Sequence, residues 1–187
     1  MSKLIDARTR QLQKELMDVG AKLDAGDDSR ILVWVIPGLL ACSHRPLRRH
    51  PYFGGPQRDL PPEAGPLIVE WIRRVKGDGV QSVISMMGRR EHRHYDLSAV
   101  GAADLLDLYH MEGLQVRSVP WEDPKYTGST PRPSYGEQLL QIRGQALIAF
   151  DQLQKPVLLH CSSGIDRSSP VAAFIASQRR VSSAVLD

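Results

Sequence analysis

Short apolar runs alternate along the chain with longer stretches in which apolar and polar residues are mixed. The short runs are bounded by Gly, Pro or polar residues, which is typical of buried strands; they lie at residues 31–36, 80–86, 114–119 and 156–159. The longer stretches have the apolar spacing of helices; they lie at residues 4–19, 67–76, 102–112 and 135–154, and a further helix is expected to start near residue 169.

Because strands and helices alternate, we expect an α/β fold with a largely parallel central sheet and helices on both faces. Ligands of such sheets bind beyond the carboxyl ends of the strands. The length of 187 residues predicts one domain over residues 1–187, with residues 1–30 as an N-terminal helical extension and residues 31–180 as the core.

Composition and charge narrow the class of protein. The formal net charge of +3 is too small to indicate a nucleic-acid partner. The two cysteines do not suggest a disulfide framework, so a reducing, cytoplasmic location is expected. No apolar run approaches the ~20 residues of a membrane span, and the first residues lack the apolar core of a signal peptide.

The run His-Cys-Ser-Ser-Gly-Ile-Asp-Arg-Ser at residues 160–168 carries the strongest chemical signal. It joins a predicted strand to a predicted helix, so backbone amides and a helix N-terminus direct positive potential at one spot. This potential favours the thiolate form of Cys161, which is the nucleophilic form. The planar fork of Arg167 matches two oxygens of a phosphoryl group.

The other residues of this run have expected roles around the same group. The loop residues that would bind phosphate together with Arg167 are Ser162, Ser163, Gly164, Ile165 and Asp166. Gly164 would let the loop bend where a side chain would obstruct it. Ser168 would donate a hydrogen bond to the sulfur and so ease its departure from a cysteinyl-phosphate, and His160 would order the loop.

At His160, Cys161, Gly164, Arg167 and Ser168 the sequence resembles the cysteine-dependent protein tyrosine phosphatases, whose signature is His-Cys, five residues, Arg, and Ser or Thr. Residues 35–39 also look like the first strand of the small dual-specificity phosphatases. The resemblance implies a metal-independent enzyme without a cofactor. Such an enzyme hydrolyses phosphotyrosine, phosphoserine or phosphothreonine in proteins through a cysteinyl-phosphate.

This chemistry also needs a carboxylic acid that protonates the leaving oxygen and later activates water. In the family this acid is an aspartate after a strand and before the long helix that leads to the signature. Asp123 therefore takes the role, with the adjacent Glu122 as its rival and a simple turn as the third interpretation. The stretch from Asp123 to Cys161 is longer than is usual in the family, with residues 127–134 as the insertion.

Two basic clusters, at residues 44–50 and 89–94, bear on the substrate. If both flank the site, they would attract a polyanion such as a phosphoinositide, an inositol phosphate, an RNA 5′-phosphate or an acidic phosphopeptide. A solvated basic surface explains them equally well. Asp166 before Arg167 recurs in family members that act on phosphoinositides and inositol phosphates.

Other functions use a similar loop. A non-catalytic module that binds phosphorylated partners is disfavoured by the intact signature, and a sulfur-transfer or arsenate-reducing enzyme by the placement of Arg167. His92 and His94 lack companion ligands at metal-binding spacing, so no metal site is expected. Cys42 could form a protective disulfide with Cys161, but burial as a small apolar residue is favoured.

Overall fold

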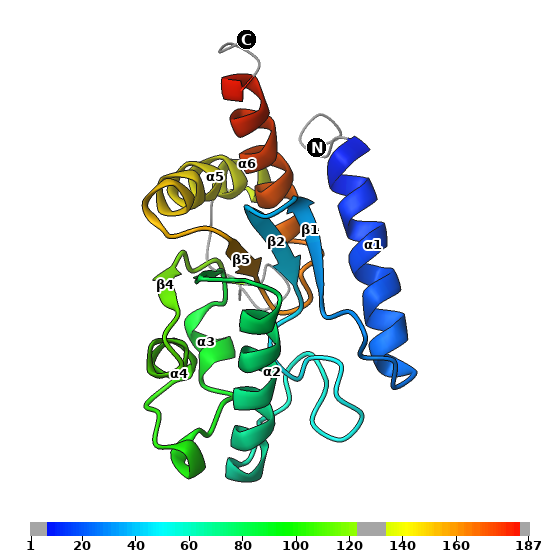
Figure 1. Ribbon diagram of the computed structural model, residues 1–187, viewed down its shortest axis with the longest axis vertical. Helices are drawn as coiled ribbons and strands as arrows, with labels where there is room; N and C mark the ends of the chain where they lie inside the picture. Colours follow the sequence, from blue (N-terminus) through cyan, green and yellow to red (C-terminus); the bar gives the residue numbers. More distant parts are fainter. Residues whose placement is uncertain (1–6, 123–133, 184–187) are drawn as a thin grey trace.

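The computed structural model describes residues 7–122 and 134–183, with side chains described up to residue 179. The helices are α1 (Ala7–Asp24), α2 (Gly65–Gly77), α3 (Arg89–His92), α4 (Leu105–Met111), α5 (Tyr135–Gln152) and α6 (Ser168–Ser183), with two short 3-10 helices, η1 (Pro62–Ala64) and η2 (Ser98–Val100). The strands are β1 (Leu32–Ile36), β2 (Leu40–Ser43), β3 (Ser82–Ser85), β4 (Gln115–Ser118) and β5 (Val157–His160). Figure 1 shows their arrangement.

The five strands form one sheet in the order β1-β2-β5-β3-β4. β1 pairs with β2 in antiparallel fashion, whereas the pairs β2–β5, β5–β3 and β3–β4 are all parallel. The expectation of a largely parallel sheet in an α/β fold is therefore confirmed. β2 lies where the apolar residues 39–42 allow a second edge strand after the first one. α3 was not among the predicted elements, because it is only four residues long and carries little periodic signal.

Helices cover both faces of the sheet. Strand side chains alternate between the two faces, so neighbouring residues of one strand pack against different helices. Val157 and Leu159 of β5 belong to a hydrophobic cluster with residues of α1, α5 and α6, whereas Leu158 belongs to a second cluster with residues of α2 and α4. All three side chains are fully buried. Burial on both faces explains why the strand is an uninterrupted apolar run.

The helix ends follow local sequence signals. Asp104 precedes α4, and its carboxylate accepts hydrogen bonds from the N–H groups of residues 106 and 107 at 2.8 and 2.9 Å. Ser134 and Glu137 form a capping box at the start of α5, where each side chain accepts a hydrogen bond from the other residue's N–H. α1 runs to Asp24, beyond the predicted end at residue 19, because Leu23 extends its apolar stripe.

The parallel register brings three strand ends together at one edge of the sheet. His160, the last residue of β5, is in register with Ser43 at the end of β2 and with Ser85 at the end of β3. The segments that follow these strands therefore leave the sheet side by side, and one of them begins with Cys161. Among the described helices, none has the length and apolar content needed to cross a membrane.

Candidate active site

The loop after β5 surrounds the sulfur of Cys161. This side chain is only 1% exposed, and the N–H of Gly164 donates a hydrogen bond to its Sγ at 3.2 Å. Gly164 has a φ of +72°, and a Cβ at this position would lie 2.7 Å from the carbonyl oxygen of Ser43. Only glycine fits both the left-handed backbone and the close approach to β2, and this fit brings the amide to the sulfur.

Neighbouring elements hold the carbonyl groups of the loop. The carbonyl of Ser162 accepts a hydrogen bond from the N–H of Arg45 at 3.0 Å, and the carbonyl of Gly164 accepts from the N–H and hydroxyl of Ser169 at 3.1 and 2.8 Å. The carbonyl of Ile165 accepts from Gln13 Nε2 at 3.3 Å, and the carbonyl of Asp166 accepts from the Tyr135 hydroxyl at 2.8 Å. These donors come from the segment after β2, from α6, from α1 and from α5. The backbone of the loop is thus fixed from several directions before any ligand binds.

Arg167 lies at the end of the loop with its guanidinium buried, and the residue is 2% exposed. Its Nη1 and Nη2 donate to the two carboxylate oxygens of Glu91, both at 2.6 Å. Nη1 also donates to the carbonyl oxygens of Trp121 at 2.6 Å and Met86 at 3.3 Å. The bidentate ion pair fixes the plane of the guanidinium beside the cysteine loop.

Glu91 was not identified as a site residue from the sequence, because it stands among the basic residues of the 89–94 cluster. In the structure it is buried on α3 and also accepts a hydrogen bond from the N–H of Gly88 at 2.8 Å. Burial by itself would raise the pKa of Glu91, but hydrogen bonds from Arg167 and its charge hold this pKa below its usual value. The signal available from the sequence was a single carboxylate within a basic segment that follows a predicted strand.

His160 connects the loop to α4. Its Nδ1 lies 3.2 Å from the carbonyl oxygen of Cys161, and its Nε2 lies 2.9 Å from the hydroxyl of Tyr109. Because a carbonyl oxygen only accepts, Nδ1 carries the proton and the Tyr109 hydroxyl donates to Nε2. Burial lowers the pKa of His160 to about 4, so the ring is neutral at pH 7. Its contacts order the backbone at Cys161.

The 44–50 cluster is not a uniformly solvated surface. His44 is buried, and its Nε2 donates to the carbonyl oxygen of Leu16 on α1 at 3.1 Å. Arg45 is also buried, and it donates to the Tyr95 hydroxyl at 2.8 Å and to the carbonyl of Gly55 at 2.9 Å. His44 and Arg45 therefore belong to the protein interior next to the cysteine loop and not to its solvated surface.

Asp123, the predicted general acid, lies outside the described residues. Its rival Glu122 is described, and its Oε1 accepts a hydrogen bond from the N–H of Arg89 at 2.8 Å. This N–H is at the start of α3, two residues before Glu91. The carboxylate of Glu122 is therefore held against α3 in this structure.

The residues on either side of this acidic segment contact the cysteine loop. The carbonyl of Trp121 accepts from Arg167, and the hydroxyl of Tyr135 donates to the carbonyl of Asp166. The rings of Trp121 and Tyr135 stack with centroids 5.2 Å apart, and Trp121 Nε1 donates to Gln138 at 2.9 Å. Both ends of the segment between them are consequently anchored at the site.

The hydroxyl of Ser168 was expected to contact the sulfur of Cys161. The hydroxyl of Ser168 is buried at the first residue of α6, and it has no hydrogen-bond partner among the described residues. The expected bond from Ser168 to the sulfur is thus not formed here.

Cys42 is a buried free thiol on β2. Its pKa is raised well above the usual value, mainly by burial and to a smaller extent by the nearby Cys161. Within the described ranges, no three His, Cys, Asp or Glu side chains are grouped so as to hold a metal.

Comparison with known proteins gives a weak similarity to solved structures. No family model and no curated protein matches the sequence. Among solved structures, the chain is similar to a crystal structure of Tk-PTP in a mutant form, with 23% sequence identity and a TM-score of 0.44 over 83% of this chain and 79% of that chain. A similarity of this size carries no argument about activity, which rests on the residues of the site.

We predict that the protein loses stability as the pH falls below 6.5. His44 and His160 have pKa values of about 4 because they are buried, against 6.5 for the free side chain. The unfolded chain therefore binds more protons than the folded protein between pH 6.5 and pH 4, and the free energy of unfolding falls by up to about 1.4 kcal/mol per pH unit for each histidine.

Urea unfolding between pH 7.5 and pH 5 measures this slope. His44→Gln should remove about half of the combined contribution of His44 and His160, whereas His110→Gln, at an exposed position on α4, should leave the slope unchanged. Equal slopes for the wild type and His44→Gln would contradict the prediction.

We also predict that Glu91→Gln lowers the free energy of unfolding by about 3 kcal/mol, because it leaves the buried charge of Arg167 without its counter-ion. Glu15→Gln is the matched control, since Glu15 pairs with Arg30 at 3.9 Å on the surface and such pairs contribute about 1 kcal/mol or less. Urea unfolding of the two variants at pH 7 tests the difference, and equal losses would show that the buried pair has no special weight.

Proposed function

We propose that this chain is a phosphatase that hydrolyses phosphate monoesters through a cysteinyl-phosphate on Cys161. One observation carries the proposal: a buried cysteine sulfur accepts a backbone N–H in a loop whose arginine is held by a buried carboxylate. Loop amides and Arg167 would bind the non-bridging oxygens of the phosphoryl group, where negative charge must be stabilised during transfer. The residues invoked for this binding are Ser162, Ser163, Gly164, Ile165 and Asp166.

The proposed reaction has two steps. The thiolate of Cys161 attacks phosphorus, an S–P bond forms, and the P–O bond to the leaving group breaks while a carboxylic acid protonates the leaving oxygen. Water then attacks the phosphocysteine, its proton passes to the same carboxylate, and the S–P bond breaks to release phosphate and the thiolate. Ser168, whose buried hydroxyl is close in sequence to Arg167, would donate to the departing sulfur.

We assign the carboxylic acid to Asp123. Glu122 is held by the N–H of Arg89, which supports giving the role to its neighbour. The attachment of Trp121 and Tyr135 to the cysteine loop supports placing the acid in the segment between them. His160 has an indirect role in this scheme, because it contacts the backbone of Cys161 and not the substrate.

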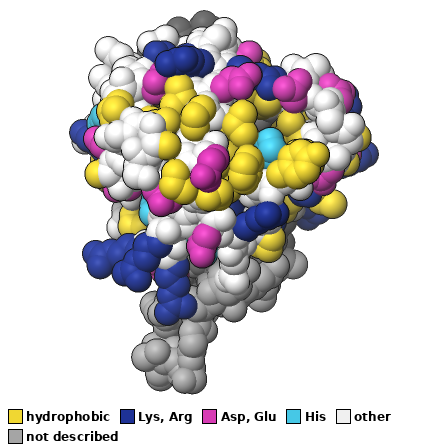
Figure 2. Space-filling model, turned by 90° about the horizontal axis from the view of Figure 1, so that it is seen from below, with side chains coloured by type: hydrophobic (Ala, Val, Ile, Leu, Met, Phe, Trp, Pro, Cys, Tyr) yellow, Lys and Arg dark blue, Asp and Glu magenta, His cyan; other side chains and the backbone are white. Residues whose placement is uncertain are grey.

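We propose phosphorylated proteins as the substrates, acted on in the cytoplasm by a dual-specificity type of phosphatase. Arg89 and Arg90 are exposed on α3, beside the Glu91 that holds Arg167. Figure 2 shows one group of basic side chains at the lower left of the face it draws, and further basic side chains scattered around that face. This charge supports substrates with several negative groups, which include acidic phosphopeptides and also phosphoinositides, inositol phosphates and RNA 5′-phosphates.

Cys161→Ser should abolish turnover of an aryl phosphate, because a serine hydroxyl at this site is far less nucleophilic than a thiolate. Cys42→Ser is the control, since Cys42 has no role in the proposed reaction, and it should keep turnover. Rapid quenching of the wild type with a ³²P-labelled substrate should trap a phosphoryl group on Cys161. Full turnover by Cys161→Ser would refute the proposed nucleophile.

Asp123→Asn should lower kcat by about 100-fold or more while KM changes little, because the acid acts in the transition state. Glu122→Gln keeps its side-chain volume and should retain most of the turnover. The loss in Asp123→Asn should be smaller for a substrate whose leaving group is already acidic, such as 4-nitrophenyl phosphate, than for phenyl phosphate. The reverse ranking of the two variants would move the acid to Glu122.

A further inference from the structure

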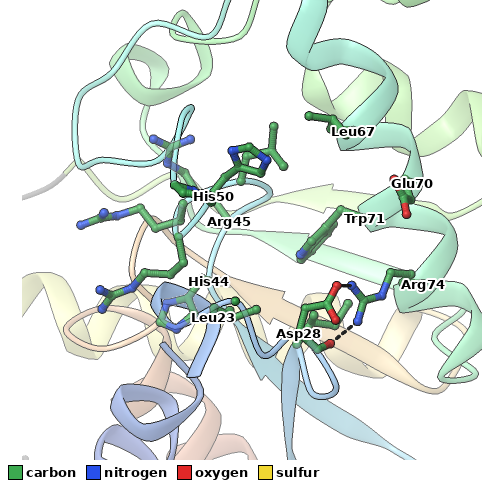
Figure 3. Close-up of a pocket in the computed structure, with 15 residues that line it drawn as sticks. Leu23, Asp28, His44, Arg45, His50, Leu67, Glu70, Trp71 and Arg74 are labelled. Carbon is green, nitrogen blue, oxygen red and sulfur yellow. Dashed lines mark hydrogen bonds and ion pairs between the residues drawn. The ribbon is translucent and has the colours of Figure 1, made fainter. Parts of the chain in front are cut away.

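A cavity of about 290 Å³ lies next to the segment after β2, which contacts the cysteine loop. Its walls come from the C-terminal end of α1, from the segment after β2 and from α2 (Figure 3). Cavities that bind small molecules measure roughly 300–1,000 Å³, so this one is just below the smallest of them in volume. No residue of the 160–168 run lines it, so it is separate from the proposed phosphate site.

One side of the cavity is apolar. Trp71 and Leu67 of α2 face it, and Figure 3 shows Trp71 pointing across the space toward the segment after β2. Leu23 of α1, Ile31 and Leu47 also line the cavity, and Figure 3 shows Leu23 beside His44, across the space from Trp71. The tryptophan is partly exposed, so a flat apolar group could stack on it and leave water.

The other side is basic. Arg48 and Arg49 line the cavity together with His50, and all three are partly exposed. Four arginines line the cavity in all, against the two carboxylates of Asp28 and Glu70, so positive charge is in excess. The Asp28 carboxylate is paired with Arg74, and the Asp24 carboxylate is paired with Arg49 at 2.8 Å. With Asp24 included, the four arginines face three carboxylates, and one positive charge remains in excess.

The basic wall is also the support of the cysteine loop. Arg45 lines the cavity, and its backbone N–H donates to the carbonyl of Ser162 at 3.0 Å. His44 lines it as well, and its ring binds the carbonyl of Leu16 on α1. The preceding Ser43 presents its carbonyl to Gly164, whose N–H meets the sulfur. A ligand in the cavity would therefore touch the segment that sets the position of the loop.

We propose that this cavity is a second binding site, which takes a small molecule with a flat apolar body and one anionic group, and that its occupancy changes the reactivity of Cys161. The apolar body lies against Trp71 and Leu67. The anionic group lies toward Arg48 and Arg49. Binding shifts or stiffens the 43–45 segment, and this change reaches the sulfur through Ser162 and Gly164.

Binding can be tested with 8-anilinonaphthalene-1-sulfonate, whose fluorescence rises when it leaves water. N-phenyl-1-naphthylamine has the same aromatic body without the sulfonate and serves as the matched neutral probe. We expect one sulfonate probe per chain, with energy transfer from Trp71 that is lost in Trp71→Phe. The sulfonate probe should bind about tenfold more tightly than the neutral one, because its charge meets the arginines. Equal affinities for the two probes would overturn the assignment of the anionic group.

Variants place the probe in the cavity. Arg48→Gln should weaken binding of the sulfonate probe about tenfold and leave the neutral probe unaffected. Leu67→Glu should weaken binding of both probes, because it puts a carboxylate into the apolar wall. Arg73→Gln is the control, since Arg73 is on the same helix but pairs with Glu112 outside the cavity. Circular dichroism and thermal unfolding confirm that each variant is folded. Unchanged binding in folded Leu67→Glu would exclude this cavity as the site.

The link to the cysteine is measured by the rate at which iodoacetamide alkylates Cys161, followed by intact mass and peptide mapping. A saturating concentration of the sulfonate probe should change this rate at least twofold in the wild type and not in Leu67→Glu. An unchanged rate with the cavity occupied would overturn the coupling. Neither probe binding nor alkylation needs turnover. Failure of this second-site proposal is therefore distinguishable from failure of the proposed phosphatase activity.

Discussion

The buried ion pair between Arg167 and Glu91 is the contact on which the arrangement of the site depends. Two charges removed from water must satisfy each other closely, because the desolvation of either one alone is costly. Two hydrogen bonds of 2.6 Å meet this need. They join α3 to the start of α6, and the carbonyl of Trp121 binds the same guanidinium. One interaction thus sets the arginine, the cysteine loop and the start of the acidic segment relative to one another.

The sheet makes this pair possible. In a parallel sheet the carboxyl ends of neighbouring strands meet at one edge. β2, β5 and β3 end in register, so the segments that contain Arg45, Cys161 and Glu91 start side by side. The segment after β2 has two neighbours as a result: the cysteine loop on one side and the cavity on the other. The proposed coupling between the two sites follows from this shared wall.

Much of the fold could be predicted because its signals are local. Buried strands appear as apolar runs, and the capping box at Ser134 and Glu137 marks the start of α5 within four residues. The loop at 160–168 could be interpreted for the same reason, since the cysteine, the glycine and the arginine lie on one short segment. α3 was missed because four residues show no periodicity, and Tyr109 could not be connected to His160 across 51 positions.

The sequence by itself determined the class of the fold and predicted a chemistry for the cysteine loop, because strand periodicity and the spacing of a single loop depend only on neighbouring residues. The tertiary structure decided which groups surround that loop. It made Glu91, a carboxylate within a basic cluster, the partner of Arg167, and it buried His44 and Arg45, for which a solvated surface was one of two interpretations. These outcomes depend on which strand ends meet at the sheet edge and on the cost of leaving a buried charge unpaired, and neither is recorded in any short stretch of residues.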